Sequence, residues 1–166
     1  MTHILKCFVV LSCGLVASCT GNRVEHEAQA LQVVRDYYTA IQSARFLDAR
    51  KMYDDSFWPR QPPSIQTEEG WLQFHKDAAS KGATKFTYDL AVVPDKRPSS
   101  GNTRIVVNAS VKYDPSTEWA KGIREKLGGD DSSVPPQAMQ FVIGKIGSEW
   151  RILFYGFERD YSGYAR

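Results

Sequence analysis

The chain has 166 residues, and its 21 basic side chains nearly balance its 19 acidic ones. This length suits one domain with a sizeable buried core. The charge gives no indication of nucleic-acid binding, which needs a concentrated basic surface, and no basic run marks an anionic membrane as a partner.

Near the start of the chain, Lys6 precedes an apolar run that ends at Val16-Ala17-Ser18-Cys19. A positive charge, an apolar stretch and small residues before a cleavage point are typical of a secretory signal. The run is too short to span a bilayer, which takes about 20 apolar residues. The tetrapeptide resembles the lipobox of bacterial lipoproteins, which implies a signal peptide over residues 1–18 and lipidation of Cys19. Ordinary secretion, with cleavage nearby and an unmodified Cys19, is the alternative.

The lipobox resemblance also bears on chemistry and on location. The cysteines are Cys7, Cys13 and Cys19, so cleavage and lipidation leave a mature chain of 148 residues with no free thiol. That excludes cysteine nucleophiles, internal disulfides and Cys-based zinc sites. Thr20 stands where many inner-membrane lipoproteins have Asp. In a Gram-negative host, the resemblance therefore implies anchoring in the outer membrane, facing the periplasm.

The first half of the mature chain reads as helical. Residues 19–24 are expected to form a short tether, and a period of three to four predicts a helix over residues 25–43. Because successive helical residues point about 100° apart, only Tyr38 of the Tyr37-Tyr38 pair is expected to face the core fully. A second helix is predicted over residues 46–57 and a third after the N-cap Thr67, with Gly82 as its C-terminal stop.

The second half changes to a period of two. Alternation predicts strands over residues 86–92, 105–113, 140–146 and 150–157, with Gly147-Ser148 as a hairpin turn. A short amphipathic helix is predicted at residues 119–127, followed by a flexible loop over residues 128–133. The predicted fold class is α+β, with N-terminal helices packed on a curved antiparallel sheet in one domain over residues 25–160 and a tail over 161–166.

This layout resembles the NTF2-like (SnoaL-like, cystatin-like cone) superfamily. The resemblance lies in the three helices, the Tyr37-Tyr38 pair, the closing hairpin at residues 147–152, and the run Ala49, Met52, Tyr53 and Phe57. It implies a sheet that curls around the helices and encloses an apolar pocket. Members include enzymes, ligand binders and scaffolds that dimerise through the sheet, so the fold does not choose the function.

Candidate site residues come partly from the resemblance and partly from the pattern. Enzymes of the superfamily place Asp, His or Tyr inside the cone, which makes Asp36, Tyr38 and His75 candidates for acid–base work. Trp58 and Trp71 flank a Pro-rich loop at a pocket mouth. Each has a plainer interpretation, as a surface carboxylate for Asp36 and as helix or core residues for the others.

The helix at residues 119–127 offers a docking face. Trp119, Ile123 and Leu127 are spaced by four, so they line one side, where they either bind a partner or cover their own domain. Two histidines on separate helices make a poor metal site, and no cofactor is expected. No nucleophile elbow, P-loop, H-E-x-x-H or dinucleotide motif occurs in the chain.

These observations predict a lipid-anchored envelope protein that acts as a non-enzymatic binding or assembly module, of an accessory or immunity type. Its partners would be the membrane, through Cys19, and an envelope protein or a second copy bound through the sheet. One alternative is a binder of small apolar ligands in the cone pocket. The other is an isomerase- or hydrolase-type enzyme in that pocket.

Overall fold

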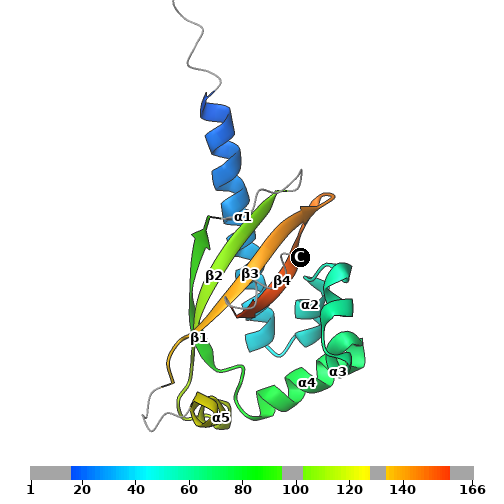
Figure 1. Ribbon diagram of the computed structural model, residues 1–166, viewed down its shortest axis with the longest axis vertical. Helices are drawn as coiled ribbons and strands as arrows, with labels where there is room; N and C mark the ends of the chain where they lie inside the picture. Colours follow the sequence, from blue (N-terminus) through cyan, green and yellow to red (C-terminus); the bar gives the residue numbers. More distant parts are fainter. Residues whose placement is uncertain (1–15, 95–102, 128–133, 158–166) are drawn as a thin grey trace, which may run out of the picture.

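The protein folds as helices followed by an antiparallel sheet (Figure 1). The computed structural model describes residues 16–94, 103–127 and 134–157, with side chains from residue 22 onward. The leader before Val16, the predicted loop at 128–133 and the tail at 161–166 lie outside the described residues. The elements are α1 (Val16–Gln42), α2 (Phe46–Lys51), the 3-10 helix η1 (Asp55–Arg60), α3 (Pro63–Gln66), α4 (Glu68–Ser80), β1 (Phe86–Val93), β2 (Arg104–Tyr113), α5 (Glu118–Leu127), β3 (Gln137–Ile146) and β4 (Glu149–Phe157).

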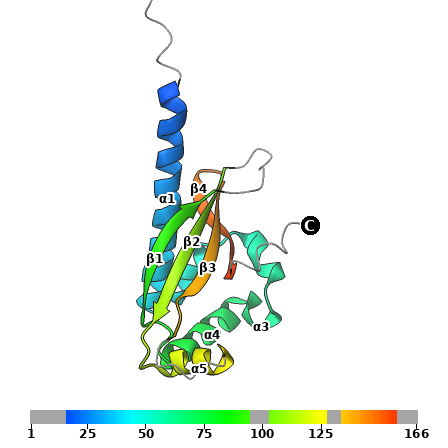
Figure 2. The ribbon, with the colours of Figure 1, turned by 60° about the vertical axis from the view of Figure 1, so that its left-hand side comes forward.

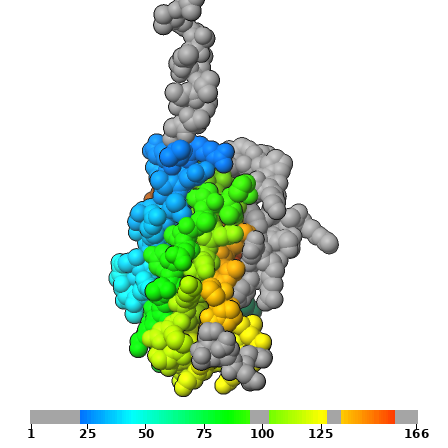
Figure 3. Space-filling model, turned by 90° about the vertical axis from the view of Figure 1, so that its left-hand side faces the viewer, coloured from blue at the N-terminus to red at the C-terminus, as the bar shows by residue number. Residues whose placement is uncertain are grey.

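The four strands form one antiparallel meander in the order β1-β2-β3-β4. The sheet curves around α1, which contacts every strand, while the first turns of α1 project past one end of the sheet (Figure 2). The opposite end carries α4 and α5, and Figure 3 shows α5 at the far end of the molecule from the start of α1. The predicted α+β class, with helices on a curved antiparallel sheet, is therefore confirmed.

The core lies between α1 and the concave face of the sheet. Tyr37 and Tyr38 are both buried, at 2% and 3% exposure. The prediction that only Tyr38 would face the core fully is wrong, because the sheet wraps around α1 and buries more than one side of the helix. Tyr38 meets Phe86 and Tyr88 of β1, whereas Tyr37 meets Tyr155 of β4.

The helix boundaries differ from the sequence prediction at two places. α1 begins at Val16 instead of residue 25, so the backbone of residues 19–24, expected to form a tether, is helical. The predicted second helix ends at Lys51, and η1 replaces its last part, because Asp54 caps a new turn by accepting from the Ser56 amide at 3.0 Å.

The ends of α4 follow the sequence signals. The Thr67 hydroxyl accepts from the Gly70 amide at 3.1 Å, as its predicted N-cap role requires. At the other end Gly82 adopts φ +90°, and the Ala83 amide donates to the Ala78 carbonyl at 3.0 Å. This is the Schellman arrangement that glycine permits. Among the described helices, α1 included, none is both long and apolar enough to cross a membrane.

Candidate functional site

A short parallel contact between the helical layer and β4 creates the candidate site. After α2 the chain runs beside β4, where Tyr53 pairs with Ile152. The Ile152 amide donates to the Met52 carbonyl at 2.8 Å, and the Asp54 amide donates to the Ile152 carbonyl at 3.0 Å. These bonds fix the start of η1 against the sheet. They leave a groove between α2, η1, α4 and the β3–β4 hairpin.

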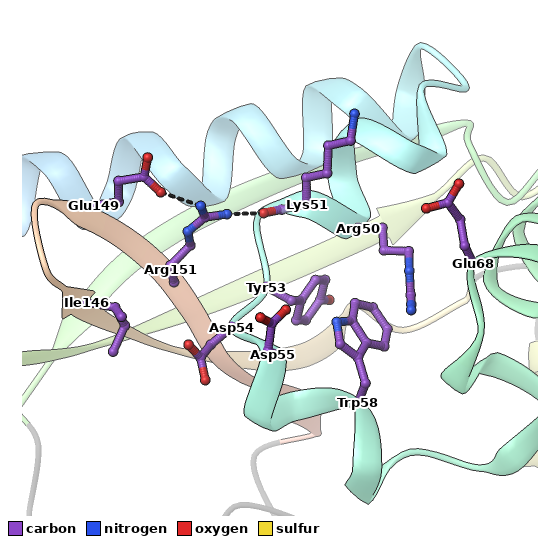
Figure 4. A pocket seen from close by; sticks show the side chains of 10 residues that line it. All are labelled: Arg50, Lys51, Tyr53, Asp54, Asp55, Trp58, Glu68, Ile146, Glu149 and Arg151. Atoms are coloured by element: carbon purple, nitrogen blue, oxygen red, sulfur yellow. Dashed lines mark hydrogen bonds and ion pairs between the residues drawn. The ribbon is translucent and has the colours of Figure 1, made fainter.

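The groove encloses about 570 Å³ and opens to solvent (Figure 4). Its lining is mainly polar and carries both signs of charge. An aromatic surface from Tyr53 and Trp58 lies among these charged groups. The lining residues are Arg50, Lys51, Tyr53, Asp54, Asp55, Trp58, Glu68, Ile146, Glu149 and Arg151.

Arg50 is the best-fixed cation of the groove. Its guanidinium carbon lies 3.5 Å from the centroid of the Trp58 ring, and its Nη2 donates to the Gln66 carbonyl at 2.6 Å. Its Nη1 is buried and has no hydrogen-bond partner among the described residues. Desolvation lowers the pKa of Arg50, against the neighbouring carboxylates of Glu68 and Glu69, which raise it. The group stays charged, because an arginine guanidinium does not lose its proton in proteins.

Arg151 closes the other end of the groove. It donates to the Lys51 carbonyl and pairs with the Glu149 carboxylate, so it ties the β3–β4 hairpin to the end of α2. This leaves Lys51, Asp55 and Glu68, all exposed side chains that make no hydrogen bond or ion pair within the described part of the chain. The groove therefore offers unpaired charges of both signs beside an ordered arginine–tryptophan stack.

The space between α1 and the concave face of the sheet is filled with aromatic rings. Tyr37 packs edge-on against Phe141 at a centroid distance of 5.6 Å, and Tyr53 packs against Phe57 at 4.3 Å. Burial raises the pKa of Tyr37, Tyr53 and Tyr155 above the ordinary value of 10.0, so all three stay neutral at physiological pH. The described interior is thus an apolar core of neutral phenols. The charged side chains that could bind a polar ligand line the groove and not this core.

The candidates for acid–base work are dispersed. Asp36 lies on the exposed side of α1, where the Gln32 amide donates to it at 2.8 Å. Tyr38 is buried in the core, and its hydroxyl has no partner among the described residues. His75 lies on α4 between the rings of Phe46 and Trp71, and burial lowers its pKa from 6.5 to about 4. These three side chains do not meet in one site.

Of the three tryptophans named as candidates, only Trp58 lies in the groove. Trp71 is 4% exposed, and its Nε1 donates to the Phe46 carbonyl at 3.0 Å, which links α4 to α2. Trp119 lies half-buried on α5 near the Tyr113 ring, while Leu127 at the end of that helix is 57% exposed. Cys19 falls on the first turns of α1, where side chains are not described.

Sequence reasoning missed Arg50 and Arg151. Arg50 follows Ala49, one of the residues that carry the superfamily resemblance, and Arg151 belongs to the closing hairpin, so both lay beside residues already singled out. The missing signal was the pairing of residue 53 with residue 152, which brings the two arginines to one groove. Within the described residues, no group of three or more His, Cys, Asp or Glu side chains is placed to hold a metal.

Comparisons with known proteins add little. No protein-family model matches the chain, and no curated protein matches it. A search of solved structures found a phospholipid-binding protein from Ralstonia solanacearum, solved in complex with a phospholipid. That protein is 14% identical, with a TM-score of 0.40, and the match covers 80% of this chain and 77% of that one.

Proposed function

We propose that this chain is a lipid-anchored protein of the bacterial envelope and that it acts as a non-enzymatic binding module. Its binding site is the groove between α2, η1, α4 and the β3–β4 hairpin. One observation carries the proposal: the Arg50–Trp58 stack holds a charged, planar group on rigid elements, beside exposed charges that have no partner in the described part of the fold.

The chemistry of the groove favours a protein segment as the ligand. Arginine and tryptophan are the residue types that most often dominate binding energy at protein interfaces. Lys51 and Asp55 supply one unpaired charge of each sign, so a peptide with a carboxylate and a basic side chain complements them. An apolar molecule would find little matching surface there, because Ile146 is the sole aliphatic side chain among the described lining residues.

The binding proposal is tested by comparing partner binding by variants inside the groove with binding by a nearby arginine variant outside it. Arg50→Ala and Trp58→Ala remove the stack, whereas Arg45→Ala removes an exposed arginine that pairs with Asp48 outside the groove. Detergent-solubilised membranes are cross-linked, and the stoichiometric partner of the wild-type protein is quantified. Both groove variants should lose the partner and Arg45→Ala should keep it. Equal recovery with all three variants would overturn the groove as the binding site.

The anchor is tested separately from the groove. Wild-type protein and Cys19→Ala are expressed in a Gram-negative bacterium supplied with labelled palmitate, and membranes are separated from soluble fractions. The wild type should carry the label and sediment with the outer membrane. Cys19→Ala should be unlabelled. Membrane retention of Cys19→Ala at wild-type size would contradict the lipoprotein assignment.

A further inference from the structure

The end of the sheet beside the start of α1 exposes apolar side chains. Val24 of α1 is 66% exposed, and Ile146 at the β3–β4 turn is 43% exposed. Within the described residues, four large hydrophobic side chains are exposed to solvent. Two of them, Val24 and Ile146, belong to the start of α1 and to the β3–β4 turn, which lie at the same end of the molecule (Figure 1). The other two, Phe74 and Leu127, belong to α4 and α5 at the opposite end.

The hairpin is locked to α1 at this end. Trp150 Nε1 donates to Gln29 Oε1 at 2.7 Å, and the Trp150 ring lies edge-on to the His26 ring at 5.3 Å. α1 is one continuous helix through Cys19 and His26, which are seven residues apart. At about 1.5 Å per residue, Cys19 lies roughly 10 Å along the axis from the contact that holds the hairpin.

The same end carries cations without partners. Arg104 pairs through its backbone with Gly144, and the Lys145 amide donates to the Thr103 carbonyl at 3.3 Å, so Arg104 and Lys145 lie on neighbouring strands. Both are exposed, and neither side chain makes an ion pair or hydrogen bond with any described residue. Residues 104 and 145 are far apart in the sequence and become neighbours only in the folded sheet. The sequence therefore shows no run of basic residues at either position.

Three described carboxylates lie near this end, and two of them are paired with cations. Glu27 accepts from Arg23 at 2.9 Å, and Glu149 pairs with Arg151. Glu25 accepts from the Gln29 amide at 3.3 Å. Glu25 keeps its negative charge, because an amide donor does not neutralise a carboxylate. Among the described residues, Arg104 and Lys145 outnumber it and leave this end with a small positive surplus beside its exposed Val24 and Ile146.

We propose that Val24, Arg104, Lys145 and Ile146 form a membrane-facing surface that rests on a bilayer with anionic headgroups. The proposal rests on the lipid anchor at Cys19 given under the proposed function. Headgroup layers are about 5–7 Å thick on each side of the hydrocarbon core, and Ile146 lies one residue nearer the hairpin turn than Lys145, the strand partner of Trp150. An anchored α1 thus brings Ile146 to headgroup depth. Each cation there strengthens contact with an anionic surface about fivefold.

The membrane-facing surface determines the orientation of the protein relative to the bilayer. With one end held at the bilayer, α5 and the exposed Leu127 point away from it. The groove then opens sideways, with Ile146 and Glu149 at its membrane end and Glu68 at its far end. A partner entering the groove would approach along the bilayer surface.

The test uses the lipidated full-length protein with a fluorophore at one position. An acylated Cys19 leaves no free thiol in the mature chain, so Ile146→Cys takes a single environment-sensitive label, and Lys145→Cys repeats the measurement next to it. The matched control is Leu127→Cys on α5. The labelled proteins are reconstituted into vesicles of phosphatidylethanolamine and phosphatidylglycerol that contain a headgroup-spin-labelled lipid, and into phosphatidylcholine vesicles with the same quencher.

The labels at 146 and 145 should be quenched several-fold more than the label at 127, and more strongly in the anionic vesicles. Arg104→Ala in the Ile146→Cys background removes one cation, so it should weaken the contact with the anionic surface about fivefold and lower the quenching. Equal quenching at 146 and 127 in a protein whose mass shows acylated Cys19 would overturn the membrane-facing surface and leave the anchor standing. A mass without acyl chains would overturn both.

Discussion

The guanidinium carbon of Arg50 lies over the indole of Trp58, 3.5 Å from the ring centroid, and Arg50 Nη2 donates to the Gln66 carbonyl at 2.6 Å. The stack joins the end of α2 to η1 and to the end of α3. Arginine suits this position because its planar fork stacks and donates at once, which a lysine ammonium cannot do. The same contact that stabilises the fold also presents the charge to the groove.

Arg50→Ala should lower the free energy of unfolding by about 1–2 kcal/mol, from the lost cation–π contact and the lost charged hydrogen bond. Arg50→Lys should recover less than half of this loss, because the ammonium loses the stacking geometry. Urea denaturation followed by tryptophan fluorescence measures both. Arg45→Ala, which breaks an exposed pair with Asp48, is the control and should cost at most about 0.5 kcal/mol. Equal losses at positions 45 and 50 would refute a special role for the stack.

The Tyr38 hydroxyl supplies a second prediction, because it is buried and has no hydrogen-bond partner in the described structure. A buried unsatisfied polar group costs about 1–3 kcal/mol, so Tyr38→Phe should leave stability unchanged or raise it by about 1 kcal/mol. The ring contacts with Phe86, Tyr88 and Phe141 remain in that variant. Tyr38→Ala removes them and should cost about 3–5 kcal/mol. A clear loss of stability in Tyr38→Phe would show that the hydroxyl has a partner.

The sequence predicted local structure well and contacts between distant segments poorly. Alternation located the four strands, and Thr67 and Gly82 marked the ends of α4, because these signals act within a few residues. The burial of Tyr37 was missed, since helical periodicity assumes one flat contact face and the sheet curves around α1.

The groove was missed for a related reason. Trp58 was singled out from its neighbours in the chain, but its partner Arg50 was not, because α2 had been extended through residue 57 as one helix. In a continuous helix, residues 50 and 58 are eight apart, about 12 Å along the axis, and cannot stack. The break after Lys51 and the contact of Tyr53 with Ile152 bring them together. No local pattern encodes that contact.

Two glycines give opposite predictions for the same substitution. Gly82 adopts φ +90°, and a Cβ there would lie 2.5 Å from Thr117 Cγ2, so Gly82→Ala meets both backbone strain and a clash. It should lower the free energy of unfolding by about 1–3 kcal/mol. Gly122 lies within α5, where a Cβ would meet nothing within 4 Å. Gly122→Ala should therefore stabilise the protein by about 0.5–1 kcal/mol. Thermal unfolding followed by circular dichroism measures the change in stability of both variants. A change of the same sign in the two variants would contradict this geometry.

His75 makes stability depend on pH in a defined window. Its pKa is 6.5 when unfolded and about 4 in the fold, where burial beside Phe46 and Trp71 disfavours the charged form. Between these values the unfolded state binds more protons than the folded state, so stability falls as pH drops from about 6.5 to 4. It is unaffected by this residue above that window. At about 1.4 kcal/mol per pKa unit, the loss reaches at most about 3 kcal/mol.

The His75 contribution is isolated by replacing the imidazole with a group that does not titrate. His75→Gln should be less stable than the wild type at pH 7.5, since it loses aromatic packing, but its stability should fall less steeply between pH 6.5 and 4. Urea titrations of both proteins at four or five pH values measure the difference in slope. Because carboxylates titrate in both proteins, their effect cancels in that difference. Parallel curves for the two proteins would mean that His75 is protonated in the fold as readily as in the unfolded chain.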